Sequence, residues 1–153
     1  MHNDCNICPL LQNPKHQIFM TKYWAVNLGN DQIYLGRAYV TIREQKGSLG
    51  ELSAEEWADL GVVVRSLEQA YKAAFSAVPI NWTCMMNHAY KKNPADPHLY
   101  WHVFPRYRTP VTLAGITFND DLYGEHFSLD ATREVTDKVV DEIAAKLKTH
   151  LIA

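Results

Sequence analysis

The chain has 153 residues, of which 47% are hydrophobic, and its formal net charge is −2. This length suits one domain with a sizeable core, and the charge argues against a basic surface for duplex nucleic acid. No apolar stretch approaches the roughly 18 residues of a membrane span, and the polar residues after Met1 predict no secretory signal, hence a cytoplasmic location.

The N-terminal segment, up to about residue 14, carries a C-x-x-C knuckle made by Cys5 and Cys8. Two cysteines at this spacing can hold two corners of a zinc tetrahedron. The third cysteine, Cys84, lies in an apolar run and is interpreted as a small buried hydrophobe. An odd number of cysteines in a reducing compartment argues against a disulfide framework.

Two strands are predicted next, over residues 17–27 and 32–42, because both segments are rich in aromatic and β-branched residues. Residues 28–31 between them are turn material and predict a hairpin. A long helix is predicted from Ser53, whose hydroxyl can cap the amide of Glu56 while the Glu56 carboxylate returns the bond. Its expected apolar face follows steps of three and four residues and comprises Trp57, Leu60, Val64, Leu67, Tyr71 and Ala74.

Residues 80–86 predict a third strand, which a polar loop over 87–97 connects to a fourth over 98–106, so that these two pair antiparallel. Residues 109–127 are expected to be irregular. A final helix is predicted over 130–151, with Val135, Val139, Ile143 and Leu147 on its buried side. Strands in meanders with one helix between them and one after them indicate an α+β fold.

The strand over 98–106 is the most informative segment. Side chains alternate across a strand, so His98, Tyr100 and His102 share one face, while Leu99, Trp101 and Val103 form a core face. Two imidazoles that flank a phenol make a row of titratable groups. We therefore expect this strand to bury one side and to line a site with the other.

This segment, His98-Leu99-Tyr100-Trp101-His102-Val103-Phe104-Pro105-Arg106, resembles the signature of the histidine-triad (HIT) superfamily, which reads His-x-His-x-His and often continues with Pro-Arg. The asparagines Asn81 and Asn87, the knuckle at Cys5 and Cys8, and the helix start at Ser53 also match features of the family. The likeness covers about residues 1–107. Residues 108–153 more loosely resemble the C-terminal extension of some members.

The resemblance implies one HIT-like domain over 1–153, with an antiparallel sheet of about five strands and two main helices, and a homodimeric assembly. It implies nucleotide binding, and hydrolysis or nucleotidyl transfer at the α-phosphate. It assigns catalytic roles to His102, Tyr100 and His98, and nucleotide or phosphate contacts to Asn81, Asn87 and Arg106. It also implies that His98 can join Cys5 and Cys8 in a zinc site.

The chain departs from the family pattern at the middle position, where Tyr100 replaces the nucleophilic histidine. Forming phenolate at pH 7 costs about 4 kcal/mol from its reference pKa, which is about a thousandfold in rate. Neighbouring His98 and His102 could act as bases for Tyr100, and Arg106 or Lys92 could lower its pKa. Loss of the usual nucleophile is the simpler interpretation.

A second departure concerns zinc, because the segment 42–47 lacks the histidine that many C-x-x-C members place there. The fourth ligand is left open between water, Glu44 and His88, and a metal-free knuckle is the alternative. Three functions therefore compete. They are a HIT-type phosphohydrolase or nucleotidyl transferase with weak or altered activity, a non-catalytic nucleotide-binding module, and a zinc-bearing interaction protein.

Overall fold

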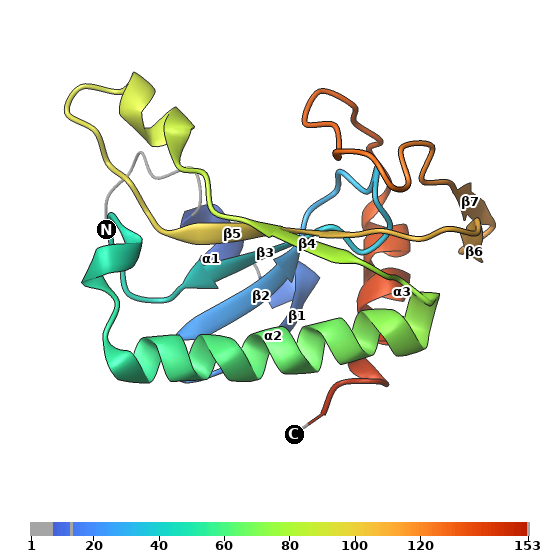
Figure 1. Cartoon of the computed structure of the whole chain (residues 1–153), viewed down its shortest axis with the longest axis horizontal. Helices are drawn as coiled ribbons and strands as arrows, with labels where there is room; N and C mark the ends of the chain where they lie inside the picture. Colours follow the sequence, from blue (N-terminus) through green and yellow to red (C-terminus); the bar gives the residue numbers. More distant parts are fainter. Residues whose placement is uncertain (1–7, 13, 153) are drawn as a thin grey trace.

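A computed structural model describes residues 8–12 and 14–152, so that Cys5 lies outside the described part of the chain. Its centre is a five-stranded antiparallel sheet in the order β1-β2-β3-β5-β4 (Figure 1). This agrees with the α+β architecture expected from the sequence. The strands are β1 (Gln17–Met20), β2 (Trp24–Leu28), β3 (Ala38–Ile42), β4 (Ile80–Thr83) and β5 (Tyr100–Pro105).

The segment predicted as one strand over 17–27 is two strands, because the chain turns between β1 and β2. The Thr21 amide donates to the Trp24 carbonyl at 2.9 Å. The Thr21 hydroxyl and the Tyr23 amide both donate to the Asp59 carboxylate. The predicted hairpin is found, because β2 pairs antiparallel with β3, but its second strand begins at Ala38 and not at residue 32, so the connection is the longer loop 29–37. This loop becomes one border of the site described below.

The long helix is α2 (Ala54–Phe75), and its predicted capping box is confirmed: the Glu56 amide donates to Ser53 Oγ, and the Ser53 amide donates to Glu56. The predicted apolar face is only partly right. Trp57 is 42% exposed, because the buried position in the first turn is taken by Glu56, which folds back to complete the cap. The buried face consists of Glu56, Leu60, Val63, Ser66, Leu67, Ala70, Tyr71 and Phe75.

The core lies between this helix and one face of the sheet, along which α2 runs (Figure 1). Leu99 and Val103 are fully buried there, and Trp101 packs against them partly buried, as predicted. The other face of β5, which carries Tyr100 and His102, is therefore free of core packing against α2. Short 3₁₀ and α segments complete the N-terminal half: α1 (Cys8–Gln12), η1 (Pro14–His16), η2 (Leu49–Glu51) and η3 (Asn87–Lys91).

The C-terminal region is more ordered than predicted. A small hairpin, β6 (Val111–Leu113) and β7 (Ile116–Phe118), lies within the expected irregular segment. The last helix, α3 (Asp137–Lys148), begins later than residue 130, because the preceding residues run beside the loop 29–37 (Figure 1). The Gln32 amide donates to the Arg133 carbonyl there at 2.8 Å. The side chains of Val139, Ile143 and Leu147 are buried, as predicted.

Within the described ranges, the structure contains no helix with both the length and the apolar character needed to cross a bilayer.

Candidate active site

The site face of β5 carries an aromatic row. The Tyr100 and His102 rings meet edge to face with centroids 4.9 Å apart, and Phe104 continues the row on the same face. Strand β3 adds Tyr39, which pairs with His102 in the sheet register and lies 5.2 Å from its ring. Alternation along two neighbouring strands thus gathers these side chains over one patch of the sheet.

Tyr100 and His102 line one cavity of about 410 Å³, together with Asn87 from η3. This volume falls in the range of small-molecule sites. The predicted grouping of a phenol, an imidazole and an asparagine is therefore found in one place. Among the described residues, the lining consists of Arg37, Met85, Asn87, His88, Tyr100, His102, Leu129 and Asp130. We call this the His102 cavity.

His102 is a neutral imidazole at physiological pH. Burial, followed by the electrostatic influence of Arg37 and His88, lowers its pKa to about 4. Its Nδ1 atom is buried and has no hydrogen-bond partner among residues 8–12 and 14–152. A buried polar nitrogen of this kind is ready to pair with a ligand.

The phenol of Tyr100 is shifted in the direction opposite to that of an activated nucleophile. Burial raises its pKa, Tyr39 and Cys84 add to this, and only Arg37 acts to lower it. Phenolate is thus harder to form here than in free tyrosine. Since Tyr100 stays protonated, its hydroxyl offers a hydrogen-bond donor to the cavity.

The first histidine of the motif lies elsewhere. His98 precedes β5, is only 4% exposed, and does not line the His102 cavity. Its Nε2 is 2.7 Å from the Ile42 carbonyl oxygen, which requires a proton on Nε2 and leaves the lone pair on Nδ1. That Nδ1 atom is 3.6 Å from Cys8 Sγ. His98 therefore links the start of β5 to the N-terminal segment.

This geometry suits two ligands of one zinc ion. With Zn–S near 2.3 Å and Zn–N near 2.0–2.1 Å, tetrahedral ligands lie about 3.6 Å apart. A backbone carbonyl that holds the second ring nitrogen is the usual support for a ligating histidine. Cys5 lies outside the described residues, and within them the structure shows no group of three His, Cys, Asp or Glu side chains arranged for a metal.

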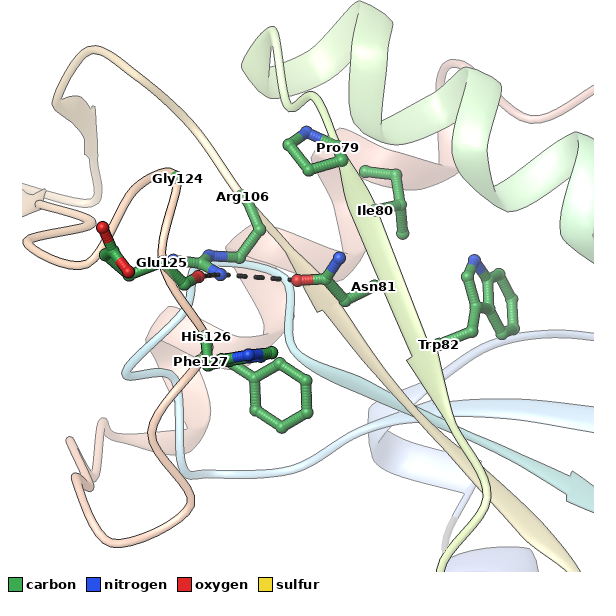
Figure 2. A pocket seen from close by; sticks show the side chains of 9 residues that line it. All are labelled: Pro79, Ile80, Asn81, Trp82, Arg106, Gly124, Glu125, His126 and Phe127. Carbon is green, nitrogen blue, oxygen red and sulfur yellow. Dashed lines mark hydrogen bonds between the residues drawn. The ribbon is translucent and has the colours of Figure 1, made fainter.

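Asn81 and Arg106 lie together in a second cavity of about 500 Å³ on the same face of the sheet (Figure 2). There the Arg106 guanidinium points to the Asn81 side-chain oxygen, 3.4 Å away. It also forms a two-pronged ion pair with the buried Asp120 carboxylate, at 2.6 and 2.9 Å. The structure does not bring these two predicted phosphate contacts to the His102 cavity.

The segment between β7 and α3 forms part of the site. Phe127 stacks on Phe104 with centroids 4.2 Å apart, and the Ser128 amide donates to the Tyr34 hydroxyl. Leu129 and Asp130 follow and reach the His102 cavity. Residues of this segment were not predicted for the site, because no local pattern signals which distant strand they cover. Arg37 and Tyr39, from the β3 region, were missed for the same reason.

Comparison with known proteins finds matches to the fold of this chain but not to its sequence. No family model matches the sequence, and no curated protein matches it. Solved structures do match in shape, and eight of them are 14–19% identical to this chain. A hypothetical histidine triad nucleotide-binding protein from Sulfolobus tokodaii superposes with a TM-score of 0.66 at 16% identity, over 95% of this chain and 91% of that one.

Two further structures agree. Plasmodium falciparum diadenosine triphosphate hydrolase gives a TM-score of 0.61 at 15% identity, over 90% of this chain and 76% of that one. A Zn-bound histidine triad family protein from Mycobacterium smegmatis gives 0.60 at 19% identity, over 95% and 96%. The five-stranded sheet, its two main helices and these superpositions together show that the chain has the fold of the histidine-triad (HIT) proteins.

Proposed function

We propose that this protein is a HIT-superfamily nucleotide-binding protein whose His102 cavity receives the phosphate end of a nucleotide. The observation that carries the proposal is the meeting of Tyr100, His102 and Asn87 around one cavity of about 410 Å³. The likeness of the fold to a nucleotide-binding protein and to a dinucleotide hydrolase supports it. Asn81 and Arg106, in the neighbouring cavity, stay candidates for indirect support of the ligand.

We infer that turnover is slow or absent. Raising the pKa of Tyr100 makes phenolate cost more than the roughly 4 kcal/mol it costs at its reference pKa. A base works best when its pKa is close to the working pH, and His102, with a pKa near 4, is a weak base for activating water. Both potential activators are therefore mismatched to hydrolysis or nucleotidyl transfer at neutral pH.

Calorimetric titration with adenosine 5′-monophosphate and other mononucleotides tests binding. Incubation with adenosine 5′-phosphoramidate and dinucleoside polyphosphates tests turnover. We expect micromolar binding with little product from the natural protein, and more product from Tyr100→His, which restores an imidazole nucleophile. Tyr100→Phe is the matched control, since it keeps the ring and removes the hydroxyl. Absence of nucleotide binding would refute the proposal, and turnover that survives in Tyr100→Phe would exclude a covalent role for Tyr100.

We also propose that Cys5, Cys8 and His98 hold zinc. The separation of 3.6 Å between Cys8 Sγ and His98 Nδ1 supports this, as does the carbonyl that fixes the other ring nitrogen. Zinc there would tie the N-terminal segment to the start of β5. Metal analysis of protein purified without added zinc should find it, and Cys8→Ser and His98→Asn should lose it. Cys84→Ser, a cysteine distant in sequence from the knuckle, should retain it.

We further propose a homodimer. Strand β4 lies at one edge of the described sheet, where its outer hydrogen-bonding groups are available for pairing. Sedimentation equilibrium at micromolar concentrations measures the molecular mass in solution, and a mass equal to that of one chain would contradict the homodimer.

A further inference from the structure

The His102 cavity contains a cation that the sequence motif does not include. Among its lining residues, Arg37 is the side chain that carries positive charge at every physiological pH. His102 is neutral there, and His88 is an exposed residue of η3. The cavity also contains the carboxylate of Asp130, which is exposed and therefore screened by solvent. Arg37 is thus the permanent positive charge among the lining residues.

Arg37 is held in place before any ligand arrives. It follows Gly36, whose φ of +86° turns the chain into β3, and an added Cβ there would come within 2.8 Å of the Tyr71 ring. The Arg37 guanidinium forms an ion pair with Asp31. Its central carbon lies 5.0 Å from the centre of the Phe104 ring, in cation–π contact. Only 7% of the residue is exposed.

Arg37 nevertheless retains hydrogen-bonding capacity. Its Nε is buried and has no hydrogen-bond partner in the part of the chain that the structure describes. The same holds for His102 Nδ1, on a residue that lines the same cavity. Leaving a buried polar nitrogen unpaired costs about 1–3 kcal/mol, and both residues that carry these nitrogens line the His102 cavity, which makes them its candidate partners for a polar ligand.

Arg106, the arginine of the motif, has no such capacity. Its five N–H groups match five hydrogen bonds: two to Asp120, and one each to Asn81, Leu122 and Glu125. Binding a phosphate through Arg106 would require breaking this set, including an ion pair whose side chains are 3% and 0% exposed. Removing one partner of a buried pair is strongly unfavourable.

We propose that Arg37, and not Arg106, is the arginine that binds the phosphoryl oxygens of a phosphate-ester ligand in the His102 cavity. This inference rests on the proposed nucleotide-binding function and names the group that supplies the charge. A guanidinium that keeps Asp31 on one N–H can still present others to a phosphoryl oxygen, because its donors form a planar fork. His102, being neutral, adds a hydrogen bond and no charge.

The test uses inorganic phosphate and adenosine 5′-monophosphate as separate probes of the full-length protein. Arginine Nε–Hε NMR signals are followed during each titration, and the Arg37 signal is identified by its loss in Arg37→Lys. We expect that signal to shift with both probes. We expect Arg37→Gln to bind both at least about tenfold more weakly, and Arg108→Gln, which removes an exposed arginine outside both cavities, to bind within about twofold of the natural protein.

The outcomes separate this inference from the proposed function. If folded Arg37→Gln binds adenosine 5′-monophosphate as tightly as the natural protein, the role of Arg37 is refuted and nucleotide binding stands. If phosphate binds through Arg37 and no nucleotide binds, the anion site stands and the proposed function fails. If neither probe binds, both fail. Should Arg37→Gln not fold, an Arg37 Nε–Hε signal, identified with Arg37→Lys, that does not shift at saturating phosphate refutes the inference without the glutamine variant.

Discussion

The buried ion pair between Arg106 and Asp120 gives the sharpest test of how the C-terminal segment is anchored. Asp120→Ala removes both carboxylate oxygens and leaves the Arg106 guanidinium, 3% exposed, without its counter-charge. Breaking a buried pair from one side costs about 3–5 kcal/mol. For a domain of about this size, each kcal/mol lowers Tm by roughly 2–4 °C, so we expect a drop of roughly 6–20 °C.

Urea unfolding followed by tryptophan fluorescence measures the change in free energy, and differential scanning calorimetry measures Tm. Asp121→Ala is the matched control, because it removes an exposed carboxylate one residue away, and surface changes of this kind stay within about 0.5 kcal/mol. The double variant Arg106→Met/Asp120→Leu should recover most of the loss, since apolar replacement of a whole buried pair is often neutral. A loss below about 1 kcal/mol for Asp120→Ala would refute the reasoning.

Three other predictions concern pH, capping and backbone geometry. The folded-state pKa of His102 lies near 4, below the ordinary 6.5, so the unfolded chain binds more protons between these values. His102 therefore contributes stability that is complete above pH 6.5 and declines as the pH falls towards 4. Urea unfolding measures how much the free energy of unfolding falls between pH 7 and pH 5, and this fall should be smaller for His102→Gln than for the natural protein. An equal fall in both would contradict the prediction. Ser53→Ala removes the cap of α2 and should cost about 0.5–2 kcal/mol in the same assay, whereas an unchanged midpoint would mean that water replaces the bond to Glu56. Gly36→Ala combines a φ of +86° with an approach of 2.8 Å to Tyr71, and should lower stability by more than about 1 kcal/mol; a gain in Tm would show that the turn relaxes freely.

The strand that carries the motif shows which side-chain positions the sequence can predict and which it cannot. Alternation put His98, Tyr100 and His102 on one face, and the structure brings Tyr100 and His102 to one cavity. His98 lies before the first residue of β5, beside Cys8, because its imidazole bonds the Ile42 carbonyl. Whether that position forms part of a zinc site stays a prediction, since Cys5 lies outside the described residues.

Local chemistry alone determined the approximate positions of the strands of the main sheet, the start of α2 at its Ser53–Glu56 capping box, the antiparallel pairing of β4 with β5, and the buried side of α3. These follow from period, capping and turn residues that lie close together in the chain. Tertiary structure decided which arginine meets the cavity. Arg37 and Arg106 are indistinguishable as residue types, but Asp120 and three further acceptors use all the donors of Arg106, while Arg37 lines the cavity with His102 and keeps an unpaired nitrogen. The hydrogen-bonding partners of each arginine come from segments distant in the sequence. Packing of the whole chain brings these segments together, and no local sequence pattern predicts which of them meet.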